Sequence, residues 1–419
     1  MKGASLDRPA KAILSPRRKS VRRGNRFIAV SVATALLSIS AVSAVAFGAL
    51  KSPASPSTVN ARGGATVRWV VPHDQFGAPT VPIPGGASGT SGGLNSVSCP
   101  TSTFCVAVGA DSDSNGVAST SKNGGTSWSQ VALASGEPDL NAVDCESASQ
   151  CVAVGTGAIV RTTNGGKKWT SYAVPTSDTT LLGVNCPNLT TCVSVGVSPS
   201  EVGPYAGEVL DSTDGGSTWT AASFPQSAGA MGDVDCPTST FCVSVGASIL
   251  VSNDGGKDWS ARSVSGGTGV LRTVSCRSAT TCVAIGPNPA GAQDSTAAAY
   301  EVITTNGGVS WNSMTMPAGT ASLDTLSCST GSLCEAAGSP LKGDSAPIYL
   351  SENGGTSWSV DGGAPSSVNN VSSVNCTSTA GCVLVGDSGQ GPVAITSNSG
   401  GVFSNHPVGS LVRSAKDVS

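Results

Sequence analysis

The sequence predicts an all-β protein, a seven-bladed β-propeller with four-stranded blades that follows an N-terminal transmembrane helix. A module of Cys, five residues, Cys, then Gly, a Gly-Gly turn and Trp recurs seven times along the chain, with a variant turn in the last copy. The first cysteines of successive modules lie 40–52 residues apart, which is the length of a four-stranded blade. The composition, with 53 Gly, 12% charged and 4% aromatic residues, suits thin strands and tight turns.

Each module divides into four short strands bounded by turn residues. In the first module we expect them at 94–99, 105–109, 117–121 and 127–133. The second strand is small and apolar in nearly every copy, as in CVAVG and CVAIG, so we expect it to be buried on both faces between neighbouring blades. The fourth strand is more polar and alternates, as an outer strand would.

The paired cysteines predict one disulfide within each blade. Five intervening residues place the two cysteines at the facing ends of the first and second strands, where a tight connection brings them within disulfide reach. Zinc is the competing interpretation, but zinc ligand pairs are closer in sequence and converge on one ion. The seven predicted bridges are Cys99–Cys105, Cys145–Cys151, Cys186–Cys192, Cys236–Cys242, Cys276–Cys282, Cys328–Cys334 and Cys376–Cys382.

The connection between the third and fourth strands carries a repeated octapeptide. Asn or Asp before Gly predicts a tight hairpin, because both tolerate positive φ and their side-chain oxygens can cap nearby N–H groups. We interpret these residues as structural, because they recur in every blade. The copies are SKNGGTSW (121–128), TTNGGKKW (162–169), STDGGSTW (212–219), SNDGGKDW (252–259), TTNGGVSW (304–311), SENGGTSW (351–358) and TSNSGGVF (396–403), the last with Phe for Trp.

These octapeptides resemble the Asp-box, or bacterial neuraminidase repeat, [Ser/Thr]-x-[Asp/Asn]-x-Gly-x-x-Trp, and the seven copies cover about 95–405. By its overall pattern the chain is similar to propellers of the photosystem II stability and assembly factor type and to sialidase-like propellers. The resemblance implies a propeller fold. It does not by itself imply an activity, because such propellers include hydrolases, lectin-like binders and assembly factors.

The N-terminal segment predicts export. Residues 27–50 are 24 uncharged residues, which as a helix would cross a bilayer, and the basic residues before them predict a cytoplasmic N-terminus. A cleaved signal peptide is the alternative, with candidate cleavage sites at 42–44 and 44–46. In both cases the cysteines reach a compartment where they can oxidise.

The charge distribution argues against nucleic-acid binding. Residues 1–51 hold 10 of the 23 basic residues and 1 of the 26 acidic ones, so the rest of the chain has 13 basic and 25 acidic residues, a net charge of −12. Nucleic-acid binding needs clustered Lys and Arg. The exported part of the chain carries the opposite sign.

A sialidase-like hydrolase would need three converging arginines and a Tyr/Glu pair. Tyr300 with Glu301, and Tyr205 with Glu201, are the best pairs, but Tyr300-Glu301 opens a third strand and is interpreted as sheet packing. We therefore predict no catalytic residue and no enzyme, although paired carboxylates of a general glycosidase stay open. The arginines after Gly93 are Arg161, Arg262, Arg272, Arg277 and Arg413.

One loop has the pattern of a calcium site. Asp111, Asp113 and Asn115 alternate before Gly116, as oxygen ligands do in calcium loops. The twelfth position, however, is Lys122 instead of Glu. We expect a solvated polar turn and no cofactor, with calcium as the weaker alternative.

The topology of a four-stranded meander predicts where a ligand binds. The first-to-second and third-to-fourth turns share one face, and the other connections share the opposite face, which holds the insertions 110–116, 197–207, 287–299 and 339–347. Variable loops on a rigid scaffold commonly carry binding sites. We expect a protein or glycan to bind there, with Glu201, Tyr205, Asp294 and Asp113 as contacts.

The predicted organisation is a basic cytoplasmic tail (1–26), an anchor or signal segment (27–50), a Pro/Gly/Ser-rich stalk (51–93), the propeller (94–408) and a C-terminal tail (409–419). The outer strand of the last blade comes from 67–71 or from 402–408, and we slightly favour the N-terminal strand. The predicted function is a non-catalytic binding or scaffold module, membrane-tethered at the cell surface or secreted after cleavage. The alternatives are a sialidase-like glycoside hydrolase and an envelope complex assembly factor.

Overall fold

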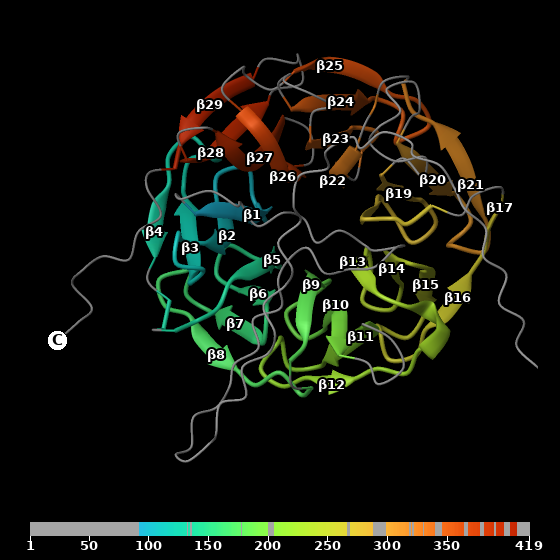
Figure 1. Cartoon of the computed structure of the whole chain (residues 1–419), viewed down its shortest axis with the longest axis horizontal. Helices are drawn as coiled ribbons and strands as arrows, with labels where there is room; N and C mark the ends of the chain where they lie inside the picture. The colour runs from blue at the N-terminus through green and yellow to red at the C-terminus, as the bar shows by residue number, and fades with distance from the viewer. Residues whose placement is uncertain are drawn as a thin grey trace, which may run out of the picture. The chain divides into compact units, whose positions relative to one another are not determined.

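The computed structural model describes residues 92–408, apart from 132, 135, 177, 200–204, 266–268, 288–298, 318–319, 321, 330, 340–345, 364–367, 378–380, 389–390 and 398–402. Seven sheets, each built on a four-stranded antiparallel meander, stand around a common centre as the blades of a propeller (Figure 1). In each blade the first strand of the meander, which leads to the first cysteine, is innermost. The predicted seven-bladed fold is confirmed.

The strands follow the predicted order within each blade. Blade 1 holds β1 (Gly93–Ser98), β2 (Cys105–Ala110), β3 (Gly116–Ser121) and β4 (Ser129–Val131), and blade 2 holds β5 (Leu140–Cys145), β6 (Cys151–Gly155), β7 (Ala158–Thr162) and β8 (Thr170–Tyr172). Blade 3 holds β9 (Thr180–Asn185), β10 (Cys192–Pro199), β11 (Tyr205–Ser212) and β12 (Thr220–Ala221), and blade 4 holds β13 (Met231–Asp235), β14 (Cys242–Gly246), β15 (Ile249–Ser252) and β16 (Ser260–Arg262), preceded by the short 3-10 helix η1 (Gln226–Ala228).

Blade 5 has a fifth strand, because the chain leaving blade 4 pairs in parallel with its outer edge. Its strands are β17 (Val264–Ser265), β18 (Thr273–Cys276), β19 (Cys282–Gly286), β20 (Tyr300–Thr304) and β21 (Trp311–Thr315). Blade 6 holds β22 (Ser322–Cys328), β23 (Cys334–Ser339), β24 (Pro347–Ser351) and β25 (Ser359–Gly363). Blade 7 holds β26 (Val368–Thr377), β27 (Gly381–Ser388), β28 (Gly391–Ser397) and β29 (Phe403–Pro407).

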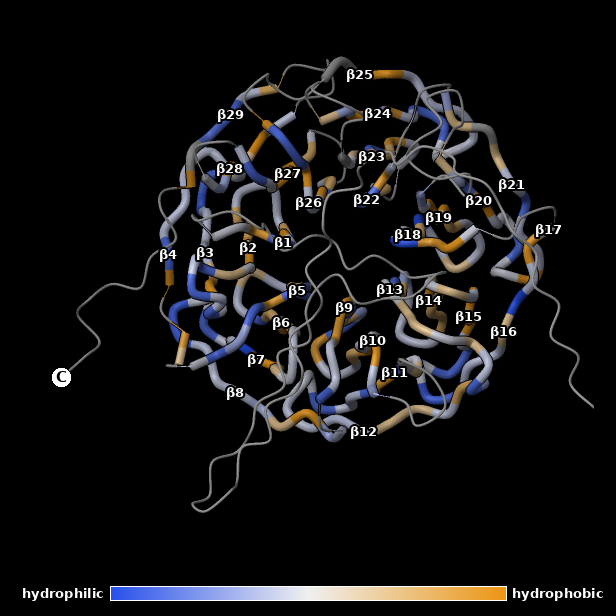
Figure 2. The backbone as a smooth tube through the Cα atoms, viewed as in Figure 1, coloured by the Kyte–Doolittle hydropathy of each residue, from blue (hydrophilic) through white to orange (hydrophobic). Residues whose placement is uncertain are grey.

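The core consists of seven apolar clusters, one at each seam between neighbouring blades. The second strands are buried along their whole length in blades 2, 4 and 5, whereas the outer strands β4, β8 and β16 are largely exposed. Hydrophobic stretches accordingly recur along the inner and middle strands of the ring (Figure 2). The predicted burial of the second strand is confirmed. Its small and β-branched side chains fit between two packed sheets.

A glycine at or near the end of each second strand is required by close packing. In six blades the ladder between the first and second strands has an irregularity of register, as between Leu140 and Ala142 in blade 2. A Cβ on Gly155 would overlap the carbonyl oxygen of Asp139, and the equivalent glycines of the other six blades meet a carbonyl in or just before the first strand in the same way. The constant glycine of CVAVG is therefore a packing requirement.

Within the described residues, the last blade is completed by strands that follow one another in sequence. The outer strand of blade 7 is β29, which pairs with β28, so the preference for the N-terminal strand in this role was wrong. Residues 67–71 lie outside the described residues. Blade 7 meets blade 1 through an apolar cluster and two hydrogen bonds, from the Val97 N–H to Ser373 Oγ (3.2 Å) and from the Cys99 N–H to Asn375 Oδ1 (3.2 Å).

The predicted anchor at 27–50 lies outside the described residues and stays a prediction. Within the described part of the chain, no helix is long and apolar enough to cross a membrane.

Candidate functional site

One face of the ring is built from the Cys–Cys hairpins and the Asp-box turns, and we call it the turn face. In blade 3 Ser212 Oγ donates to Asp214 Oδ1 (2.9 Å) and accepts the Gly216 N–H (2.9 Å). Asp214 Oδ1 also accepts the Thr218 N–H (2.8 Å), and Trp219 Nε1 donates to the Gly216 carbonyl (3.0 Å). Burial acts to raise the pKa of Asp214, but these hydrogen bonds outweigh it and lower the pKa. The box residues are structural, as expected.

Each of these turns is fastened to the hairpin of its own blade. In blade 2, for example, the Gly165 N–H donates to the Ser149 carbonyl (3.0 Å), and both turn glycines, Gly165 and Gly166, have positive φ. The equivalent glycine N–H reaches the hairpin carbonyl in blades 1 to 6, at 2.7–3.0 Å. The predicted sharing of one face by these two turns is confirmed.

All fourteen cysteines form the seven predicted disulfides, and none is free. In each pair the Cα atoms lie 3.9–4.1 Å apart, because the two cysteines face each other across the β-ladder, as Cys145 and Cys151 do. The bridges therefore lie on the face of the ring whose connections vary least in length.

A closed circle of hydrogen bonds joins the innermost strands. The residue before the first cysteine of each blade is a small polar acceptor that receives the N–H of the first cysteine of the next blade, at 2.6–3.2 Å. The acceptors are Ser98, Asp144, Asn185, Asp235, Ser275, Ser327 and Asn375. Sequence reasoning missed this set, although Ser, Asp or Asn precedes the first cysteine in all seven copies.

Three aspartates of this inner wall are recessed and partly exposed: Asp144, Asp233 and Asp235. Burial raises the pKa of Asp235 to about 7, with further repulsion from Asp233 and Asp144, and raises that of Asp233 to about 6. Burial also raises the pKa of Asp144. Their oxygens accept N–H groups of the following blade, so these carboxylates serve the junctions between blades.

The opposite face carries the second-to-third loops and the links between blades, and we call it the loop face. Its loops meet through backbone bonds, such as Gly157 N–H to the Thr179 carbonyl (2.8 Å) and Gly116 N–H to the Glu137 carbonyl (2.8 Å). Asp113 lies exposed on this face. Tyr205, the second predicted contact, is the first residue of β11, and the structure does not describe its side chain. The remaining predicted contacts, Glu201 and Asp294, lie outside the described residues.

The loop with the calcium pattern is organised by Asp111. Asp111 Oδ1 accepts the N–H groups of Asp113 (2.9 Å) and Asn115 (2.8 Å), and both oxygens of Asp111 accept from the Asn115 amide (3.1 and 3.0 Å). These contacts explain the alternating polar residues as a side-chain-capped turn. Calcium binding here stays the untested, weaker alternative.

Among the described residues, the arginine candidates lie at separate places and Glu301 lies within the sheets. Glu301 is fully buried between blades 5 and 6, where it accepts from Trp358 Nε1 (2.8 Å), so it packs within the sheets as expected. Arg161 donates to Ser217 and Arg277 to the Gly331 carbonyl, both on the turn face. Arg272 pairs with Asp324 and Arg262 lies on the outer strand β16; these four described arginines do not converge.

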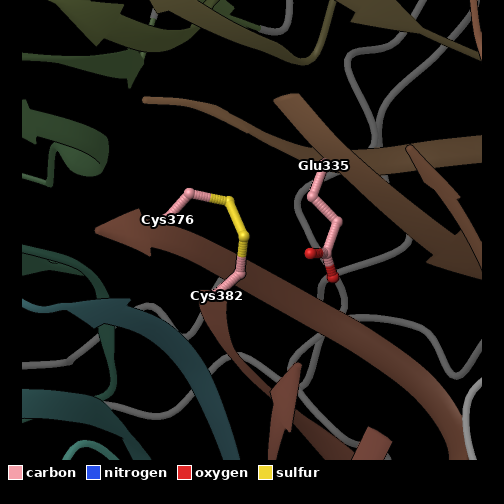
Figure 3. A group of neighbouring side chains, drawn as sticks. All are labelled: Glu335, Cys376 and Cys382. Carbon is pink, nitrogen blue, oxygen red and sulfur yellow. A yellow bond between two sulfur atoms is a disulfide. The ribbon is translucent and has the colours of Figure 1, made fainter. Parts of the chain in front are cut away.

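One cluster combines a carboxylate with two cysteine sulfurs, Glu335, Cys376 and Cys382. The sulfurs are joined as a disulfide (Figure 3), so they are not available as metal-binding thiolates. Glu335 is buried at the seam between blades 6 and 7, where Ser397 Oγ donates to its Oε2 (3.0 Å). The cluster is a packing contact of that seam.

The seventh turn is offset from its sequence motif. The motif TSNSGGVF places Thr396 in the role that Ser212 has in blade 3, opposite the second cysteine. In blade 7 Thr396 pairs with Val383 instead, and Ser397 Oγ accepts the Cys382 N–H (3.1 Å). A shift of one residue turns side chains to the other face of a strand, and Thr396 Oγ1 lies 3.1 Å from His406 Nε2.

The fold and its repeated turns define a class of protein, the seven-bladed Asp-box β-propeller. No protein-family model and no curated protein matches the sequence. Among solved structures the chain is similar to YCF48 from Cyanidioschyzon merolae, with 16% identity, a TM-score of 0.52 and coverage of 77% of this chain and 98% of that one. It is also similar to the GH74 xyloglucanase from Xanthomonas campestris, with 16% identity, a TM-score of 0.54 and coverage of 75% of this chain.

The chain spans 53% of that xyloglucanase. The WD40 propeller of Doa1 is a third similar structure, with 13% identity, a TM-score of 0.52 and coverage of 74% and 94% of the two chains. At these identities the likenesses show the fold. They confirm at that level the propeller resemblance that the octapeptides predicted.

Proposed function

We propose that the protein is an exported, membrane-tethered binding or scaffold module that holds a protein or glycan on its loop face. One observation carries this proposal: the large variation in connection length lies on one side of the ring. On the turn face the two cysteines of every blade are separated by six positions. On the loop face the second and third strands are joined by connections that run from Gly155–Ala158 to Gly286–Tyr300.

Seven disulfides support the proposal of export, because such bridges persist in oxidising compartments and are rare in the cytosol. A rigid ring with one uniform and one variable face is also the usual arrangement of a recognition scaffold, in which the loops carry specificity. The acidic excess of the exported part favours a partner that is neutral or basic.

The experiment compares loop-face and turn-face variants in binding. Within the insertions 197–207 and 287–299, residues 200–204 between β10 and β11 or 288–298 between β19 and β20 are replaced by short Gly/Ser connections. The variants are tested against an extract of envelope proteins and a glycan array. Leu189→Ser and Val309→Ser serve as matched controls, because both residues are exposed on the turn face. We expect trimming to abolish binding and the controls to keep it. Equal loss in both sets would contradict the proposal.

The same protein is screened with fluorogenic glycosides, and we expect no turnover. Turnover would replace the binding proposal with a glycoside hydrolase. Recovery of subunits of a membrane complex as the partner would identify the scaffold role as that of an assembly factor.

A further inference from the structure

One seam of the ring contains a buried glutamate at a position that is apolar at every other seam. Glu301 lies three residues before the Asp-box Thr304, on the third strand of blade 5, and has no exposed surface. The equivalent residues of the other blades are all buried, with at most 2% of their surface exposed. They are Ala118, Ile159, Val209, Ile249, Ile348 and Ala394.

The contact that Glu301 makes also departs from the repeat. In blades 1, 3 and 4 the Asp-box tryptophan donates its Nε1–H to a glycine carbonyl of its own turn, at 2.8–3.0 Å. In blade 6 Trp358 donates instead to Glu301 Oε1, at 2.8 Å, across the seam. The second oxygen, Oε2, has no hydrogen-bond partner among the described residues. A carboxylate with one neutral donor in an apolar seam is costly when charged.

Among the described residues, the ionisable groups at this seam supply no counter-charge to Glu301. Arg272 and Asp324 pair with each other between blades 5 and 6, and Arg277 donates to the Gly331 carbonyl on the turn face. Tyr349 of β24 is buried in the same apolar cluster. Burial raises the pKa of Glu301 to about 7 and the Trp358 bond opposes this, with no contribution from a charged group among the described residues.

We propose that the seam between blades 5 and 6 is a pH-sensitive joint of the ring, closed while the Glu301 carboxyl carries its proton and weakened when it ionises. The folded-state pKa lies above the usual value of 4.5, so stability from this group is complete at acid pH and is lost as the pH rises to about 7. The joint lies between β20 of blade 5 and the turn of blade 6 that carries Trp358. Ionisation of Glu301 therefore loosens this seam at neutral to alkaline pH.

The test uses the full exported chain and two substitutions. Glu301→Gln keeps an acceptor for Trp358 but cannot ionise, and Glu301→Ile installs the residue found at the equivalent positions of blades 2, 4 and 6. Glu352→Gln, at an exposed position of the blade 6 turn, is the control. The unfolding constant is measured in denaturant at pH 5.5 and 8.5. Amide exchange, corrected for intrinsic rates, is measured for peptides covering β20 and β24.

We expect the wild-type unfolding constant to rise between the two pH values by about thirtyfold more than that of either Glu301 variant, the factor set by a pKa of about 7 against 4.5. The extra exchange of β20 and β24 at pH 8.5 should be lost in both Glu301 variants, and Glu352→Gln should match the wild type. The same pH dependence in Glu301→Ile and wild type would overturn the proposal. If the variants do not fold, exchange in the wild type that rises evenly at all seven seams overturns it equally.

Discussion

Single polar residues decide how neighbouring blades are joined. Seven acceptors occupy the same place on seven first strands, yet they are Ser, Asp or Asn. All three side chains offer an oxygen to the next cysteine N–H, so the place requires an acceptor and not a charge. Where the acceptor is an aspartate, as at Asp235, burial makes its ionised form costly.

We predict that Asp235→Asn stabilises the ring at pH 8 by roughly 2–3 kcal/mol more than at pH 4, where its effect is small. The folded-state pKa of Asp235 is raised to about 7 from the usual 3.8, so its favourable contribution is present at acid pH and is lost as the pH rises towards 7. Asn185 and Asn375 show that an amide accepts the same bond. Urea unfolding at both pH values measures the effect.

The matched control is Asn185→Asp, which introduces a carboxylate at the equivalent place of blade 3 and should lower stability at pH 8. If Asp235→Asn leaves the pH dependence of unfolding unchanged, the charge of Asp235 is not what opposes stability there.

At the scale of elements, the hairpin between the first and second strands is the unit that the chain repeats most faithfully. It is closed by a disulfide and fastened to the Asp-box turn of its own blade by one backbone bond. The loop within each bridge is short, so a bridge restricts the unfolded chain only modestly. The stabilisation comes from having seven of them.

We predict that removing one bridge, by Cys145→Ala with Cys151→Ala, lowers the free energy of unfolding by roughly 2 kcal/mol or less, without loss of the fold. Reducing all seven bridges should lower it far more. Urea unfolding measures the first effect, and alkylation followed by mass spectrometry counts the thiols. Before reduction we expect no alkylated cysteine in the denatured exported protein. Free thiols at most positions would contradict the assignment of the bridges.

At the scale of the whole molecule, the ring closes by repeating the same kind of seam. Each blade is built from a continuous stretch of chain, and blades 7 and 1 meet through an apolar cluster and hydrogen bonds to Ser373 and Asn375. The closing seam therefore has the same kinds of contact as the other six. Ring closure therefore involves no strand pairing between the two ends of the described chain.

We predict that a circular permutant folds. Residue 408 is joined to residue 92 by a flexible Gly/Ser linker, and the new ends are placed between blades 3 and 4, near Gly229. The seams stay intact because no strand is divided, so thermal unfolding should remain one cooperative transition with a midpoint within several degrees of the original. An open or aggregated permutant would show that closure depends on the original order of the chain.

Much of the fold could be predicted from the repeat itself. Seven copies of one module imply seven equivalent blades, and pairs such as Cys145 and Cys151 could hardly bridge anywhere but within their own hairpin. The exceptions are single residues whose neighbours lie in another blade. From the sequence, Glu301 was interpreted as packing within a sheet, and it does lie there. Its place at a seam between blades and its bond to Trp358, however, depend on a residue 57 positions away.

The sequence by itself determined the number of blades, their strand order, the seven bridges and the sharing of one face by hairpins and Asp-box turns, because these depend on contacts within about fifty residues that repeat seven times. The tertiary structure alone decided how the ring closes, why Ser397 and not Thr396 faces Cys382, and which carboxyls are buried. Those outcomes depend on the surfaces that neighbouring blades present to each other, and a local pattern carries no record of what packs against it.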